Sequence, residues 1–333
     1  MQVHTTKELQ ALVPKMREKE FYVSQKPRRI DWAAYTANQI NDIINTIYFV
    51  KTEVDKVYCP LKHNRVGRPS VNAGFLAKGI LFIESLQITE RKAEGWISIM
   101  GPHLGFSQRL DDRVIGKAYT RKDVIDILEQ VFKNNLECDG QMSGDGSVIE
   151  KTRKENYESD KKSKKKSKKK GLHLTSIVDS KERVLAFDVG GTQECRAMHF
   201  LVKEVADIIK RDVNKLLKKT KLTLDSGFVD KKLAQLIEES GIIPYIFPKK
   251  NNVLKSKGHP AWKRMLLNLL EDVQAWLKEY HIRSHAESFH SSFKRIFGII
   301  TKKLDDAAYT QVLARIIHNN RRKTDYYNLA NLP

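Results

Sequence analysis

The order of strand-like and helix-like segments between residues 136 and 300 constrains the fold of this chain most strongly. Three strand-like segments come first, at residues 138–151, Leu172–Val178 and Arg183–Val189. The turn-like residues 179–181 predict that the last two form a hairpin. Helices and strands then alternate: an amphipathic helix over Met198–Leu217, a strand ending at Asp225, a helix over Lys231–Ser240, a strand at 242–247, a helix from about Pro260 and a helix after Tyr280. This order predicts a mixed α/β sheet flanked by helices.

The region before this sheet is predicted to be helical. Isoleucines at positions 40, 43, 44 and 47 have the spacing of an apolar helix face, and Asp31 can cap the start of that helix. Similar apolar faces recur over residues 76–86, 93–100 and 120–132. Residues 1–30 are polar and basic, and we expect them to be peripheral. We therefore expect an all-helical N-terminal domain over residues 1–135, an α/β domain over 136–300, and a basic C-terminal helix and tail over 301–333.

Composition narrows the class of partner. The formal charge of +20 in 333 residues predicts a polyanionic partner, most often nucleic acid. A membrane surface is the weaker alternative, because no apolar run approaches the roughly 18 residues of a membrane span. The first residues contain no apolar h-region, so no signal peptide is expected. We expect a cytoplasmic, nucleoid-associated protein.

The cysteines give no sign of a disulfide framework. Cys59, Cys138 and Cys195 are far apart, odd in number and without a CxxC pair. We therefore expect neither disulfides nor a zinc site, and we expect the protein to reside in a reducing compartment. We interpret all three as buried or idle thiols.

A basic tract interrupts the strand-like segments. Residues 151–170 contain eleven basic and three acidic residues, a balance of +8. A block of like charge cannot fold on itself, so a solvated loop is expected, which can contact a nucleic-acid backbone without reading its sequence. The candidate contacts are Lys161, Lys162, Lys164, Lys165 and Lys166.

Four polar residues after the last strand share one helical stripe. Tyr280, Arg283, Glu287 and Lys294 are separated by 3, 4 and 7 residues. At about 3.6 residues per turn, this spacing places a carboxylate between two cations on one helix face. Such an arrangement suits a hard metal ion held beside a phosphate group. Two simpler interpretations exist: Ser284 and Glu287 fit a capping box, and Arg283 and Glu287 fit a surface ion pair.

The spacing Tyr-x2-Arg-x3-Glu-x6-Lys resembles the signature of DDE transposases of insertion-sequence family four. The resemblance implies that Glu287 is the third acid of a catalytic triad in an RNase H-like domain, and the order of elements agrees with that fold. It also implies a helical N-terminal region for DNA binding and assembly, in which the string GRPS precedes an apolar helix; a plain helical bundle is the alternative there. The basic residues that we would test for phosphate contact in this region are Arg65, Arg68, Arg91 and Lys92.

The resemblance requires two upstream aspartates on strands. Asp225, in TLDSGF, resembles the family's second acidic motif, Asp-x-Gly-[Tyr/Phe], and Asp145, in GDGS, is the candidate for the first. Asp139 competes for the first position and Asp188 for the second. The intervals are 225 − 145 = 80 and 287 − 225 = 62 residues. The second interval leaves no room for the large β-rich insertion that some family members carry.

The family's chemistry implies two Mg²⁺ (or Mn²⁺) ions, with Asp145 bridging them and Asp225 and Glu287 each binding one. Arg283 and Lys294 would hold phosphate oxygens, whereas Tyr280 would stack on a flipped base or only pack. Zinc at the nearby histidines, residues 281, 285 and 290, is not expected, since their spacing does not suit one site.

The sequence thus predicts a transposase that cuts insertion-sequence ends and joins them to target DNA, as a homodimer on double-stranded DNA. The alternatives are a catalytically inactive, transposase-derived DNA-binding protein and another RNase H-fold nuclease.

Overall fold

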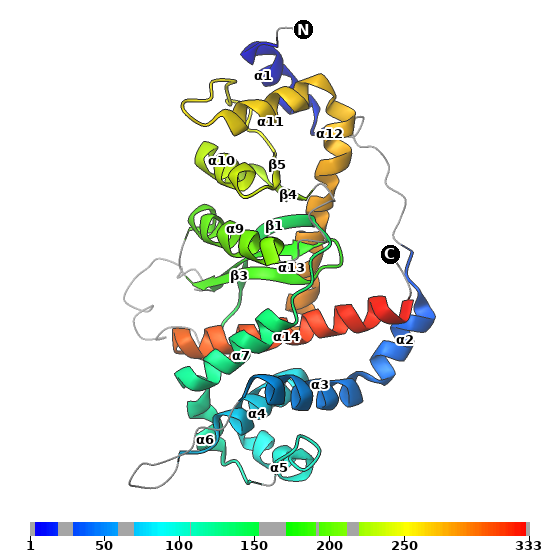
Figure 1. Cartoon of the computed structure of the whole chain (residues 1–333), viewed down its shortest axis with the longest axis vertical. Coiled ribbons are helices and arrows are strands. Elements are labelled where there is room, and N and C mark those ends of the chain that lie inside the picture. Colours follow the sequence, from blue (N-terminus) through cyan, green and yellow to red (C-terminus); the bar gives the residue numbers. More distant parts are fainter. Residues whose placement is uncertain are drawn as a thin grey trace, which may run out of the picture. The chain divides into compact units, whose positions relative to one another are not determined.

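A computed structural model describes residues 4–18, 29–58, 70–106, 108–152, 171–190, 193–211 and 220–330 (Figure 1). The chain divides into two compact units. We call residues 1–29, 137–148 and 172–292 the sheet unit, and residues 30–136, 149–171 and 293–333 the helical unit. Among the described residues, no helix is long and apolar enough to cross a membrane.

The sheet unit is built on a five-stranded mixed sheet, counted over the described residues. Its strands lie in the order β3-β2-β1-β4-β5. β4 pairs in parallel with both β1 and β5, whereas β2 and β3 form an antiparallel pair. The strands are β1 (Gln141–Ile149), β2 (Leu172–Asp179), β3 (Val184–Gly190), β4 (Lys221–Leu224) and β5 (Ile243–Ile246). The predicted hairpin and the mixed sheet are therefore confirmed.

Helices flank this sheet (Figure 1). α9 packs on β2 and β3, and α10 packs on β5, while the short 3₁₀ helix η4 contacts β4. The helices that follow the first hairpin are α9 (Glu194–Arg211), η3 (Ser226–Phe228), α10 (Lys231–Glu239), α11 (Pro260–Glu271), α12 (Val273–Tyr280), η4 (His281–Arg283) and α13 (Ser284–Phe297). This architecture confirms the predicted α/β class and is consistent with an RNase H-like fold.

The N-terminal segment differs from its prediction. α1 (Thr6–Lys15) begins with a capping box formed by Thr5 and Glu8. Leu9, Val13 and Met16 are buried in the same hydrophobic core as the strands of the sheet unit. The peripheral position that we expected for residues 1–30 was therefore wrong for this helix. Its apolar side chains recur at i, i+4 and i+7 and form a buried stripe that the surrounding basic residues obscure in the sequence.

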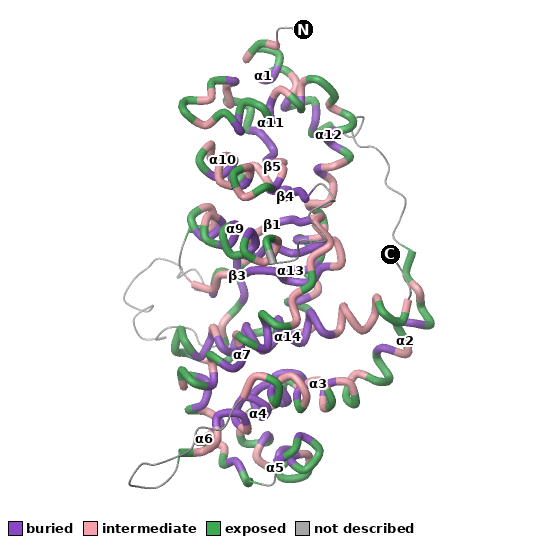
Figure 2. Tube along the Cα trace, viewed as in Figure 1, coloured by how far each residue is buried: buried purple, intermediate pink, exposed green. Residues whose placement is uncertain are grey.

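The helical unit confirms the predicted all-helical N-terminal region. α4 is buried on nearly all sides, and α14 packs against α2, α4 and α7 (Figure 2). The C-terminal helix that we predicted thus packs among the N-terminal helices. The helices are α2 (Trp32–Ile40), α3 (Asp42–Val57), α4 (Ala73–Leu86), α5 (Glu90–Met100), α6 (Asp112–Ala118), α7 (Lys122–Asn134) and α14 (Asp305–Ala330).

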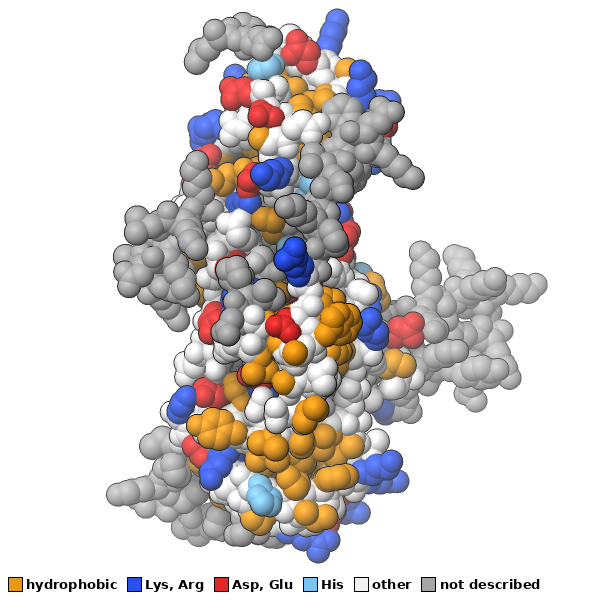
Figure 3. Space-filling model, turned by 90° about the vertical axis from the view of Figure 1, so that its right-hand side faces the viewer, with side chains coloured by type: hydrophobic (Ala, Val, Ile, Leu, Met, Phe, Trp, Pro, Cys, Tyr) orange, Lys and Arg blue, Asp and Glu red, His pale blue; other side chains and the backbone are white. Residues whose placement is uncertain are grey.

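The isoleucine pattern near residue 40 does not belong to one helix. Asp31 caps α2 as predicted, since its Oδ1 accepts a hydrogen bond from the Ala34 amide at 2.9 Å. The helix then ends at Asn41, and the buried face of α3 is built from other residues. Ile40 and Ile44 are 71% and 64% exposed. Hydrophobic side chains gather on one face of the helical unit (Figure 3), and the exposed ones on α2 and α3 include those at positions 32, 35, 40, 43, 44 and 48.

Candidate active site

Asp145 lies on β1 between two glycines. A Cβ atom on Gly144 would lie 2.6 Å from Leu224 Cδ2 and 2.7 Å from Met198 Cε, and one on Gly146 would collide with Glu194. Both glycines therefore face α9 at positions where any larger residue would clash. Because successive side chains of a strand point to opposite faces, Asp145 points to the other face of the sheet. This packing gives a physical reason for the GDG pattern.

Asp225 follows the last residue of β4. β4 runs parallel to β1, with Leu224 beside Gly144, so Asp145 on β1 and Asp225 directly after β4 follow paired positions of adjacent strands. Asp225 Oδ1 accepts a hydrogen bond from the Gly227 amide at 2.7 Å. A Cβ on Gly227 would lie 2.9 Å from the same oxygen, so glycine at this position keeps space for the carboxylate. The buried ring of Phe228 anchors this turn in the core.

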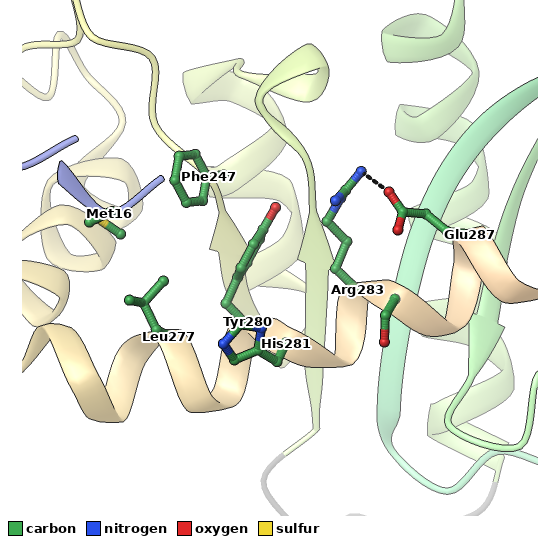
Figure 4. A pocket seen from close by; sticks show the side chains of 8 residues that line it. Met16, Phe247, Leu277, Tyr280, His281, Arg283 and Glu287 are labelled. Atoms are coloured by element: carbon green, nitrogen blue, oxygen red, sulfur yellow. Dashed lines mark hydrogen bonds and ion pairs between the residues drawn. The ribbon is translucent and has the colours of Figure 1, made fainter. Parts of the chain in front are cut away.

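The predicted stripe around Glu287 is not one continuous helix. α12 ends at Tyr280, η4 covers His281–Arg283, and Glu287 lies in the first turn of α13. Tyr280, Arg283 and Glu287 nevertheless line one pocket of about 180 Å³, together with Met16 and Phe247 among others (Figure 4). Arg283 Nη2 lies 2.6 Å from Glu287 Oε1, so the i,i+4 ion pair that we considered as the simpler interpretation is present. Both residues of this pair also belong to the cluster of charged side chains described next.

The causes of the pKa shifts at Asp145 and Arg283 indicate which charged groups lie close together. The pKa of Asp145 is raised to about 6: burial is the largest cause, the charges of Asp225 and Glu287 also raise it, and the Gly146 amide and Arg283 partly offset these effects. Burial lowers the pKa of Arg283, but Tyr280 and all three carboxylates outweigh that effect and raise it overall. The structure therefore brings Asp145, Asp225, Glu287 and Arg283 into one electrostatic cluster.

His290 is a contact that the sequence did not identify as important. This buried residue is three positions after Glu287 on α13. Its Nε2 lies 3.3 Å from the Asp145 backbone oxygen and 3.3 Å from Ser176 Oγ. It therefore joins the helix that carries Glu287 to β1 and β2. The i,i+3 spacing from Glu287 was the only signal for it in the sequence.

Tyr280 is mainly a packing residue in this structure. It is 9% exposed and stacks on Trp276 with ring centroids 5.2 Å apart, and Phe247 lies at the same distance on a tilted ring. Figure 4 shows its ring between Phe247 and Arg283. Tyr280 therefore packs at the wall of the pocket that contains Glu287.

The competing aspartates occupy other surroundings. Asp139 accepts hydrogen bonds from the Gln141 amide and from the Ser180 hydroxyl, in the turn before β1. Asp188 lies on β3 beside Thr175, where partial burial raises its pKa.

The basic residues predicted to contact DNA are only partly described. Lys294 is exposed on α13, two turns after Glu287, and belongs to the helical unit. Arg91 and Lys92 are exposed on α5. The remaining predicted basic contacts lie outside the described residues: Arg65, Arg68, Lys161, Lys162, Lys164, Lys165 and Lys166.

A family model for the transposase DDE domain matches residues 142–317, more than half of the chain. The chain belongs to this family. The match begins on β1 just before Asp145, spans Asp225 and Glu287, and ends within α14 of the helical unit. No curated protein matches the chain.

The acids of this DDE domain fit divalent cations, which the family generally uses. Asp145, Asp225 and Glu287 offer only carboxylate oxygens, the donors that hard ions such as Mg²⁺ and Mn²⁺ prefer. Among the described residues, three carboxylates share this cluster with the guanidinium of Arg283, so negative charge is in excess. Burial, and to a smaller extent the charges of the other two carboxylates, raise the pKa of Asp145.

The DDE domain is expected to respond to pH through Asp145. Its pKa rises from 3.8 to about 6 on folding, so the folded state binds more protons than the unfolded state between these values. Without metal, stability should therefore fall as the pH rises from about 4 to 6. Asp145→Asn should raise the melting temperature in EDTA at pH 7.5, and Mn²⁺ should stabilise the wild type only above about pH 6.

Thermal denaturation from pH 4.5 to 8, with EDTA or Mn²⁺, measures both effects. Asp207→Asn is the control, since this residue is exposed and pairs with Lys210 at the surface of α9. Equal destabilisation by both substitutions at pH 7.5 would contradict the expectation.

Proposed function

We propose that this protein is an active transposase of insertion-sequence family four, which cuts the ends of its DNA element and joins them to target DNA. The observation that carries the proposal is the cluster of Asp145, Asp225 and Glu287 around Arg283 on one side of the sheet. A protein that only binds DNA has no physical need for three carboxylates that repel one another and its polyanionic ligand.

The three carboxylates would hold two divalent ions, Mg²⁺ or Mn²⁺, with Asp145 shared between them. When bound, such ions lower the pKa of the attacking oxygen and neutralise the leaving oxygen. Asp145 sits on a central strand whose flanking glycines are fixed by packing, so its carboxylate is held in place before substrate arrives. His290 would position Glu287 by fixing α13 against β1.

Arg283 would exchange partners during the reaction. It neutralises Glu287 in the structure, and its buried Nε has no hydrogen-bond partner among the described residues. With cations held by the carboxylates, the guanidinium of Arg283 would be available for a phosphate oxygen, for which its fork of donors is suited. Lys294 would add a second phosphate contact, and Tyr280 would support the pocket wall or stack on a base.

DNA binding would draw largely on the basic tract at 151–170. Changing Lys161, Lys162, Lys164, Lys165 and Lys166 together to alanine should weaken binding to any duplex. If all five contact phosphates, the slope of log K against log salt should become less steep by about 4 to 5. Fluorescence anisotropy with specific and random duplexes between 50 and 300 mM salt measures this. The matched control changes five exposed lysines of the sheet unit (Lys203, Lys210, Lys232, Lys263 and Lys278), and an equal change of slope in both variants would contradict the assignment.

A homodimer on DNA completes the proposal. Two element ends must be cut together, and each chain has one cluster of these acids in its described part. The exposed hydrophobic side chains of α2 and α3 offer a surface on which a second copy can bury apolar area. Such a complex would be found where the DNA is, in the nucleoid.

Cleavage of a labelled duplex that carries the ends of the encoding element tests the function. We expect nicks at the element boundary with Mg²⁺ or Mn²⁺ and none with Ca²⁺. Salt-sensitive binding without cleavage would instead indicate a catalytically inactive DNA-binding protein. Cleavage of RNA–DNA hybrids or junctions in preference to element ends would indicate another RNase H-fold nuclease.

A further inference from the structure

A second group of metal-ligand side chains lies on the side of the sheet that α9 covers. Cys195 and His199 are four residues apart on α9 and therefore share one helix face. Asp230 is the N-cap residue of α10, which packs against α9. One ligand atom from each of the three residues lies within 4.8 Å of the other two. We propose that Cys195, His199 and Asp230 bind a Zn²⁺ ion.

The distances between the three donor atoms require only small side-chain movements to bind the ion. Zinc bonds of about 2.0–2.3 Å in a tetrahedron place neighbouring donor atoms about 3.3–3.8 Å apart. His199 Nε2 and Asp230 Oδ2 are 2.9 Å apart, so these two atoms must separate by about 0.4 Å to admit the ion. The thiol lies within 4.8 Å of both and must approach by less than about 1.5 Å, which a side-chain rotation on α9 can supply.

The donor set selects the metal. A thiolate and an imidazole are softer ligands than the oxygens that Mg²⁺ and Ca²⁺ require, and with a carboxylate they form a typical zinc set. The charges of one thiolate and one carboxylate also balance a divalent ion. The site is thus chemically distinct from the all-carboxylate cluster of Asp145, Asp225 and Glu287.

The position is accessible and leaves one coordination site open. His199 and Asp230 are 28% and 33% exposed at their side chains, so the ion can enter from solvent and keep a water as fourth ligand. The other carboxylate oxygen of Asp230 accepts the Lys232 amide at 2.9 Å, which fixes the orientation of the ligand. The interpretation as a plain His–Asp ion pair accounts for two of these residues but gives no role to Cys195.

Such an ion would stabilise the part of the chain that carries Asp225. Asp230 follows Asp225 by five residues, across η3, and α9 lines the back of the strand that carries Asp145. A bound zinc ion would link this turn to α9 on the side of the sheet that α9 covers. The inference does not depend on DNA cleavage, because it concerns ligands that the proposed reaction does not use.

Titration of the purified, chelator-treated full chain with Cd²⁺ and Co²⁺ tests the site. We expect a thiolate-to-Cd²⁺ charge-transfer band, a tetrahedral Co²⁺ spectrum, and a higher melting temperature with Zn²⁺. Cys195→Ser should abolish the band and weaken Zn²⁺ binding by more than about 10–100-fold, the loss seen when even an outer-shell partner is removed. His199→Asn keeps a hydrogen-bond donor for Asp230 and should also impair binding.

Two controls separate this site from others. Cys138→Ser removes another thiol of the sheet unit and should leave the band intact, as should Glu287→Gln, which alters the carboxylate cluster. Absence of the band in the wild type, or its survival in Cys195→Ser, would overturn the proposal. Neither result would bear on cleavage with Mg²⁺, so the proposed function is tested independently, by the cleavage assay.

Discussion

Replacing Asp145 by asparagine should reduce Mg²⁺-dependent cleavage of element ends by at least about 10³-fold, because the ions that we propose it holds would supply several kcal/mol of stabilisation to the transition state. The substitution keeps the size and shape of the side chain but removes the charge that would bridge two cations. Asp225→Asn and Glu287→Gln should have effects of the same order. DNA affinity should stay close to that of the wild type, since these groups repel phosphates when no metal is bound.

Single-turnover cleavage, measured beside anisotropy on the same duplex, separates chemistry from binding. Asp188→Asn and Asp139→Asn are matched controls, since both lie near the sheet and compete with the assigned acids in sequence. Each should retain cleavage within a few-fold of wild type. If Asp188→Asn abolished cleavage and Asp225→Asn did not, the second acid would have been assigned to the wrong strand. Loss of DNA binding in all the variants would indicate a folding defect rather than a catalytic one.

The sequence predicted the sheet well because its strands carry local signals. The hairpin and the strand before Asp225 combine β-branched, apolar residues with clear turn residues, and the structure places them as predicted. The glycines beside Asp145 and Asp225 were visible as motifs. Their physical reason, close packing of Met198 against β1 and space for the Asp225 carboxylate, depends on tertiary contacts that no local pattern reveals.

Other features could not be predicted because long-range packing decides them. The helix break at residues 281–283 has no proline or glycine to indicate it, yet Arg283, its last residue, still pairs with Glu287 on α13. The isoleucine spacing near residue 40 matches a buried face, but Asn41 divides the helix and leaves Ile40 and Ile44 exposed. Cys195 looked idle because its two partners are an i+4 histidine and an aspartate 35 residues later, a grouping that only the fold creates.

The second large effect is expected for Glu84, a buried carboxylate in the helical unit. Glu84 and Arg315 are both 4% exposed at their side chains, and Arg315 Nε lies 2.8 Å from Glu84 Oε2. Tyr119 Oη and Gln311 Nε2 also donate to this carboxylate, at 2.6 and 2.9 Å. Glu84→Gln should lower the free energy of unfolding by about 3–5 kcal/mol, because it leaves the charge of Arg315 buried without compensation.

Urea denaturation followed by circular dichroism measures this loss. Glu94→Gln is the matched control: Glu94 also pairs with an arginine, Arg109, but that arginine is 78% exposed and the surface pair should contribute only about 0–1 kcal/mol. The double variant Glu84→Met, Arg315→Met should recover much of the stability, since a buried ion pair replaced by apolar side chains of similar volume is often tolerated. Equal losses in Glu84→Gln and Glu94→Gln would show that the buried network does not stabilise the unit.

Loss of Glu84 should also affect α13, the helix that carries Glu287. Arg315 Nη1 donates to the Phe297 carbonyl at 2.8 Å and to the Ile299 carbonyl at 3.2 Å, at the C-terminal end of α13. A cation at this end stabilises the helix that carries Glu287 in its first turn. Without Glu84 to orient it, Arg315 no longer holds these carbonyls in a fixed geometry. Cleavage by Glu84→Gln should therefore decline at urea concentrations below the midpoint of its unfolding, whereas Glu94→Gln should cleave as the wild type does. Full activity of Glu84→Gln under these conditions would show that α13 is held in place without Arg315.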